Sequence, residues 1–160
     1  MTTKTMLMLT ALSATMVMAS PAQARSEVCA QVSDAAVEGQ FARFNAAWAT
    51  KNPDTVTALF APGAVLLPTL SNTPRTDAAG IRDYFVSFLK RSPVGAINTS
   101  NVRLGCNMAS RVGTWTVSLT DPATGAKSDV KARYSFVYRF AGGKWWIDHL
   151  HSSVMPEGQH

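Results

Sequence analysis

The stretch RYSFVYRFAGGKWWIDHLH, from Arg133 to His151, contains two runs of alternating side chains separated by Gly142-Gly143. Alternation with a period of two is typical of a β-strand that is buried on one face. Two glycines between such runs predict a hairpin with a two-residue turn, because both turn positions favour a positive φ. The stretch therefore predicts two antiparallel strands, and the length of the turn fixes which residues lie opposite one another.

A three-residue loop would flip one strand relative to the other and place Arg133 on the same face as His151. With the two-residue turn, one face of this hairpin is almost entirely aromatic or apolar. It carries Tyr134, Phe136, Tyr138 and Phe140, opposite His151, His149, Ile147 and Trp145 in that order. The other face carries Arg133, Ser135, Val137, Arg139, Trp146, Asp148 and Leu150. We expect helices to cover the first face. On the second face Val137, Trp146 and Leu150 form an apolar patch, which predicts a contact between subunits of a homodimer or a larger homo-oligomer.

Three helices are predicted before the hairpin. Ser33 caps a helix with one apolar stripe, Asn52-Pro53 begins a short helix that ends with Phe60, and Thr76-Asp77 opens a third helix before Pro93. The stripe of the first helix consists of Val37, Phe41, Phe44 and Trp48. A short strand, 64–67, lies between the second and third helices. Strands 98–108, 111–120, 130–140 and 144–151 follow. Helices first and antiparallel strands last indicate an α+β domain, with the helices on one face of a meander.

The beginning of the chain resembles a secretory signal peptide. An apolar run from Met6 to Ala19 is followed by Ala22-Gln23-Ala24, an A-x-A cleavage pattern. The run is shorter than a membrane-spanning helix needs and is interrupted by threonine and serine. We therefore expect residues 1–24 to be removed, residues 25–160 to form a single domain, and the protein to be periplasmic or secreted without a membrane anchor.

Cysteine content and charge narrow the class of protein further. Cys29 and Cys106 are the two cysteines, and in an oxidising compartment they are expected to form one disulfide. The net charge is +5, but the basic residues are scattered, with Lys90-Arg91 as the adjacent pair. Since no basic run is present to follow a phosphate backbone, we expect no nucleic-acid partner.

Four segments carry a resemblance to a known family: VLLPTLSN (65–72), IRDYFVSFL (81–89), ARYSFVYRF (132–140) and HLHSSVMPE (149–157). With the order of elements, they resemble the nuclear transport factor 2-like superfamily, which includes polyketide cyclase-like proteins. More specifically, they resemble bacterial stand-alone relatives of the calcium/calmodulin-dependent protein kinase II association domain. The resemblance implies a cone-shaped curved antiparallel sheet wrapped around N-terminal helices, self-association through the sheet, and a pocket between sheet and helices.

The resemblance does not extend to kinase activity, because no kinase domain is present in the chain. It implies arginines in the pocket that hold a carboxylate. The aligned position for one of them is Phe136, so Arg133 or Arg103 would take that role only with a different local register. From the register of the two-residue turn we expect a pocket for a small molecule, an anionic one included. Its walls are predicted to contain Trp48, Tyr84, Tyr134, His149 and His151, and Arg133 is a further candidate that requires a different local register.

The residues of this site allow three chemical roles. His149 and His151 are spaced as His-x-His metal ligands, but no third ligand is evident, so no metal and no cofactor are expected. His151 and Tyr134 are candidate acid and base groups for an isomerase or lyase. The plainest reading is that His149 and His151 are polar groups bonded to tyrosine hydroxyls inside a core, with Trp48 and Tyr84 as packing. The sequence favours an association or ligand-binding domain and leaves enzymatic activity open.

Overall fold

The structure, a computed structural model, describes residues 28–30 and 32–156 of the chain. The expected signal peptide, residues 1–24, lies outside the described residues. Within them, no helix combines the length and the apolar character required to cross a membrane.

The helices begin at the predicted capping residues. They are α1 (Asp34–Ala49), α2 (Pro53–Thr57) and α3 (Ala78–Phe88), and a short 3-10 helix, η1 (Leu89–Arg91), extends α3. The side chains of Ser33, Asn52 and Asp77 each accept a hydrogen bond from a backbone N–H in the first turn. These caps provide acceptors for N–H groups that lack a partner within the helix. The predicted apolar stripe of α1 is buried, which confirms its orientation.

The strands form one five-stranded mixed sheet. They are β1 (Phe60–Leu67), β2 (Val94–Gly105), β3 (Met108–Thr120), β4 (Lys127–Ala141) and β5 (Lys144–Val154), in the order β1-β5-β4-β3-β2. The antiparallel meander from β2 to β5 was predicted. The parallel pairing of β1 with β5 was not. Phe60, predicted to end the second helix, instead begins β1 and pairs with Ile147.

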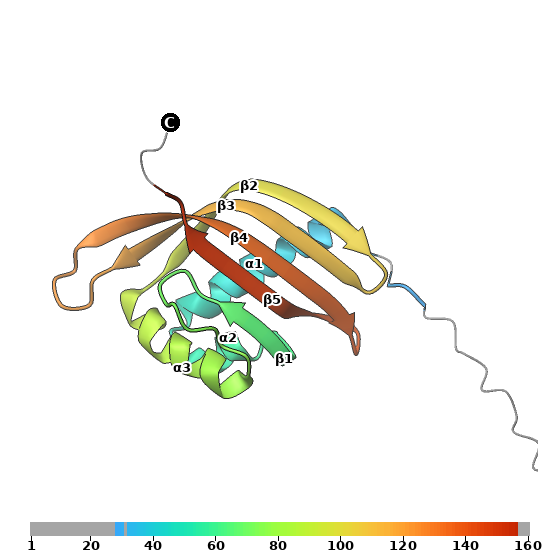
Figure 1. Ribbon diagram of the computed structural model, residues 1–160, viewed down its shortest axis with the longest axis horizontal. Coiled ribbons are helices and arrows are strands. Elements are labelled where there is room, and N and C mark those ends of the chain that lie inside the picture. Colours follow the sequence, from blue (N-terminus) through green and yellow to red (C-terminus); the bar gives the residue numbers. More distant parts are fainter. Residues whose placement is uncertain (1–27, 31, 157–160) are drawn as a thin grey trace, which may run out of the picture.

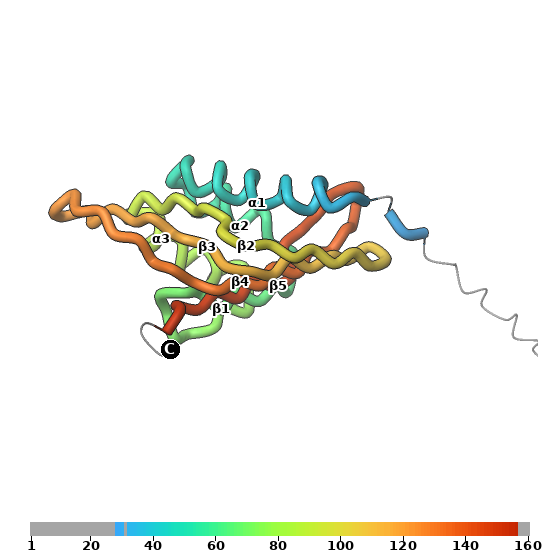
Figure 2. The backbone as a smooth tube through the Cα atoms, turned by 90° about the horizontal axis from the view of Figure 1, so that it is seen from above, coloured from blue at the N-terminus to red at the C-terminus, as the bar shows by residue number. Residues whose placement is uncertain are grey.

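The curved, unclosed sheet packs its inner face against the helices, as Figures 1 and 2 show. Aromatic rings fill much of the space between them. Phe44 of α1 is fully buried, and its ring centroid lies 4.7 Å from that of Trp48 and 5.5 Å from that of Phe136 on β4. Tilted and edge-on contacts of this kind are favourable arrangements of aromatic pairs. The expected α+β architecture, with helices on one face of the sheet, is confirmed.

The predicted disulfide joins Cys29 to Cys106, across a sequence separation of 77 residues. Next to it, Asn107 accepts a hydrogen bond from Ala30 N at 2.9 Å and donates one to Val28 O at 3.2 Å. These contacts attach the segment before α1 to the turn between β2 and β3.

Replacing both cysteines by serine is expected to lower the free energy of unfolding by about 2 to 4 kcal/mol, because the unfolded chain then loses a long covalent loop. Urea unfolding of the wild type and of C29S/C106S measures the difference. Alkylation of the denatured, unreduced protein is the control and should label neither cysteine. Two labelled cysteines would contradict the pairing.

Candidate functional site

The hairpin between β4 and β5 follows the predicted register only as far as Asp148. Gly142 and Gly143 have φ values of 60° and 77°, as a two-residue turn requires. Phe140 pairs with Trp145 and Tyr138 pairs with Ile147, as expected. The next pair is Val137 with His149, so Asp148 is an extra residue in β5. It forms a β-bulge, a feature that reverses the alternation of the strand beyond it.

The reversal places His149 and His151 on the outer face of the sheet. Leu150 and Ser152 take the inner positions, opposite Phe136 and Tyr134. The prediction that both histidines face the helices is therefore wrong, and so is the placement of Leu150 in an outer subunit contact. Leu150 is only 3% exposed, whereas His151 is exposed.

Burial energies explain why the bulge is favourable. Full burial of a leucine side chain contributes about 1.5 to 3 kcal/mol, and the bulge moves Leu150 into the core. It also leaves His149 and His151 outside the core, where they need no buried hydrogen-bond partner. Asp148 remains on the outer face, where it accepts a hydrogen bond from Arg139 Nε at 3.0 Å.

Tyr134 and Arg133, which were also predicted as site residues, do not form a site with the histidines. Tyr134 is buried on the inner face, and its hydroxyl donates to Thr99 O at 3.0 Å. Arg133 is exposed on the outer face, where it pairs with Ser153. Since Tyr134 and His151 face opposite sides of the sheet, the acid-base pair considered from the sequence is not assembled.

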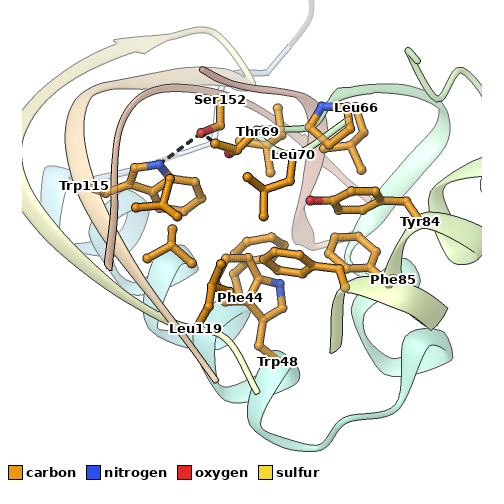
Figure 3. A pocket seen from close by; sticks show the side chains of 15 residues that line it. Phe44, Trp48, Leu66, Thr69, Leu70, Tyr84, Phe85, Trp115, Leu119 and Ser152 are labelled. Carbon is orange, nitrogen blue, oxygen red and sulfur yellow. Dashed lines mark hydrogen bonds between the residues drawn. The ribbon is translucent and has the colours of Figure 1, made fainter. Parts of the chain in front are cut away.

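A pocket does lie between the sheet and the helices, at the end where β1 leads into α3 (Figure 3). Trp48 and Tyr84, both predicted as wall residues, line it. The remaining lining residues are Phe44, Leu66, Pro68, Thr69, Leu70, Phe85, Phe88, Trp115, Val117, Leu119, Val130, Leu150 and Ser152.

The polar end of this pocket is Ser152, which the bulge turns inward. Its Oγ accepts a hydrogen bond from Trp115 Nε1 at 3.1 Å and a second from Thr69 Oγ1 (Figure 3). Sequence reasoning missed Ser152 as a pocket residue because continuous alternation placed it on the outer face. The signal that could have found it is Leu150, because the regular register exposes this apolar side chain while it buries the two neighbouring histidines.

The pocket is nearly full. Its free volume is about 20 Å³, which is room for one or two water molecules. Leu70, in the loop between β1 and α3, extends its side chain toward the middle of the pocket (Figure 3). The same residue is 39% exposed, so it is also part of the surface.

Burial changes the acidity of two tyrosines on the inner side. It raises the pKa of Tyr84 far above the usual value of 10.0, although the positive charges of Arg91 and Arg75 oppose the shift. Burial raises the pKa of Tyr138 in the same direction, and the Tyr138 hydroxyl has no hydrogen-bond partner among the described residues. Both hydroxyls therefore remain protonated and uncharged well above neutral pH.

No group of three or more His, Cys, Asp or Glu side chains with the spacing of a metal site occurs in residues 28–30 and 32–156.

The sequence profile of the calcium/calmodulin dependent protein kinase II association domain matches residues 34–156, which include all the helices and strands described above. The chain belongs to this family. A solved protein described as such an association domain, from Xanthomonas campestris, is 43% identical to it. The alignment covers 84% of this chain and 100% of the Xanthomonas chain, with a TM-score of 0.75.

More distant structures share the fold alone. A ketosteroid isomerase-like protein from Erwinia carotovora is 16% identical, with 76% of this chain and 95% of that chain covered and a TM-score of 0.63. A Streptomyces avermitilis protein, named as a dehydratase of the nuclear transport factor 2-like family, is 11% identical, with 76% and 96% covered and a TM-score of 0.69. The expected cone-type fold is thereby confirmed. A search of the curated proteins finds no match.

Ser152→Ala is expected to lower the free energy of unfolding by about 1 to 3 kcal/mol, because Trp115 Nε1 loses its acceptor in a buried position. Ser153→Ala is the matched control on the outer face and should change stability by less than about 0.5 kcal/mol. Urea unfolding measures both variants. Equal effects, or a larger effect at Ser153, would contradict the register beyond the bulge.

Tyr138→Phe is expected to leave stability at pH 7 unchanged or slightly higher, because it removes a buried hydroxyl without a partner. A raised pKa in the folded state means that the unfolded chain ionises first, so stability falls as the pH rises above about 10. The variant should lose less stability there than the wild type. Tyr134→Phe, which removes a hydrogen bond to Thr99, is the control and should destabilise at pH 7. Stability curves from pH 7 to 11 distinguish the two.

Proposed function

We propose that the chain is an exported, homo-oligomeric association domain that binds a small molecule between its sheet and its helices and has no kinase activity of its own. Family membership supports self-association, since this is the domain type that the family description names. Export is supported by the disulfide between Cys29 and Cys106, because such bonds persist in oxidising compartments. The apolar pocket supports the small-molecule part of the proposal.

The observation that carries the assembly proposal is the uncovered outer face of the sheet. Six apolar side chains on it, contributed by four strands, are partly or largely exposed: Val65, Leu67, Met108, Val112, Val137 and Trp146. Val65 and Val137 flank His149 in one row across β1, β5 and β4. An apolar surface spread over a sheet in this way is typical of a contact between subunits.

Two of the three interface residues expected from the sequence, Val137 and Trp146, lie on this surface. Trp146 donates from Nε1 to Ala141 O at 3.1 Å, and the Lys144 ammonium lies 3.5 Å from the centroid of its ring. These contacts hold the indole against the outer face near the hairpin turn, in a fixed position for a partner subunit. Val137 lies nearer the middle of the sheet and is the better position for a test.

Val137→Glu is expected to shift the wild-type oligomer toward monomer, because it places an unpaired charge in an apolar contact. We expect the dissociation constant to rise about 30-fold or more, the effect of losing a central interface residue. Val86→Glu is the matched control, since Val86 is 37% exposed on α3, away from the outer face. Light scattering coupled to gel filtration measures both. A wild-type monomer at micromolar concentration, or equal effects of both variants, would contradict the proposed interface.

A further inference from the structure

One hydroxyl hydrogen at the Ser152 end of the pocket has no acceptor. Ser152, Thr69 and Trp115 together carry three polar hydrogens, two on hydroxyls and one on the indole. The two hydrogen bonds that meet at Ser152 Oγ use two of them. Neither hydroxyl donates to any other described residue. Whichever way the Ser152 and Thr69 hydroxyls are oriented, one donor therefore remains free at this wall.

A second free donor comes from the opposite wall. The ring of Tyr84 is stacked on that of Phe88, with centroids 5.3 Å apart and planes at 18°. Its hydroxyl points toward Leu70 and the middle of the pocket (Figure 3) and hydrogen bonds to no described residue. Like any tyrosine hydroxyl it is a neutral donor at physiological pH, and burial raises its pKa further above the usual value.

The pocket walls contain no charged side chain. None of the fifteen lining residues is Asp, Glu, Lys, Arg or His. An anion inside would lose its hydration without a direct ion pair, which is unfavourable, and the charges of Arg75 and Arg91 would act on it only from the neighbouring hollow. A separate hollow outside the pocket is lined by Arg75, Arg91 and Asp83. This hollow shares Leu70, Tyr84 and Phe88 with the pocket.

We infer that the pocket binds an uncharged apolar ring compound whose carbonyl oxygen accepts a hydrogen bond from Tyr84. The aromatic walls suit the ring, and the hydroxyl pair of Ser152 and Thr69 offers a donor to a second acceptor on the opposite side. This inference rests on the proposed small-molecule function and specifies the chemical class of the ligand. It replaces the anionic ligand considered from the sequence.

Binding requires the side chain of Leu70 to leave the pocket, since the free volume is only about 20 Å³. The loop that carries Leu70 is closed at its base by two backbone hydrogen bonds between Leu66 and Arg75, at 2.8 and 2.9 Å. Leu70 can therefore turn outward while β1 and α3 stay in place. Leu70→Ala is expected to strengthen the binding of ring compounds several-fold, because the ligand no longer has to displace this side chain.

Three probes with the same ring test the inference: acetophenone, ethylbenzene and benzoate. Titration calorimetry, with the fluorescence of the wall residues Trp48 and Trp115 as a second readout, measures their affinities for the Leu70→Ala protein. We expect acetophenone to bind about tenfold more tightly than ethylbenzene, the value of one hydrogen bond. Benzoate should bind most weakly of the three.

Tyr84→Phe in the same background should weaken acetophenone about tenfold and leave ethylbenzene unchanged. Tyr134→Phe is the matched control, because the Tyr134 hydroxyl is bonded to Thr99 O outside the pocket, and it should change neither affinity. Circular dichroism checks that each variant is folded.

Three outcomes would overturn the inference, and they differ in what they leave standing. If benzoate binds more tightly than acetophenone, or if Tyr84→Phe weakens all probes equally, the pocket still binds small molecules but the ligand class is wrong. If no probe binds even to the folded Leu70→Ala protein, the pocket is packed core, and the small-molecule part of the proposed function fails with the inference. The assembly part is tested separately by Val137→Glu.

Discussion

The extra residue at Asp148 in β5 determines what each side of the sheet presents. Before it, β5 and β4 keep the register that the glycine turn imposes. After it, Leu150 and Ser152 face the helices while His149 and His151 face outward. The polar end of the pocket and the character of the outer face both follow from this one insertion. A strand without it would place two histidines inside an aromatic core and a leucine outside.

The sequence was sufficient for the elements with strong local signals. Ser33, Asn52 and Asp77 are capping residues whose side chains bond to the first turn of each helix, and these contacts depend only on neighbours in the chain. The turn at Gly142-Gly143 is local in the same sense. The placement of the outward residues Val137 and Trp146 needed only the part of the hairpin before the bulge, so it also agrees with the structure.

The β-bulge, the pairing of β1 with β5 and the loop residues of the pocket could not be predicted from local sequence patterns. A bulge shifts the alternation by one residue, and Asp148 carries no unique mark of it, since a charged residue in an outward position also fits a regular strand. The pairing of β1 with β5 joins segments more than 80 residues apart and depends on the whole sheet. Thr69 and Leu70 belong to a loop, and only the parallel β1 brings that loop beside Ser152. The site was therefore predicted at Trp48 and Tyr84, on helices, and missed on the strands and the loop.

The described walls of the pocket carry hydroxyl and indole donors and no histidine or carboxylate. Proton transfer near neutral pH requires a group whose pKa lies close to that pH, usually a histidine or a carboxylate. The described walls contain neither, and burial raises the pKa of Tyr84, so this tyrosine donates a hydrogen bond without giving up its proton. The likeness to isomerase-like and dehydratase-named proteins concerns the fold alone, because function depends on the side chains of the site and not on the backbone. The fold supplies the enclosed space, and the hydroxyl and indole donors that line it are the basis of the ligand class proposed above.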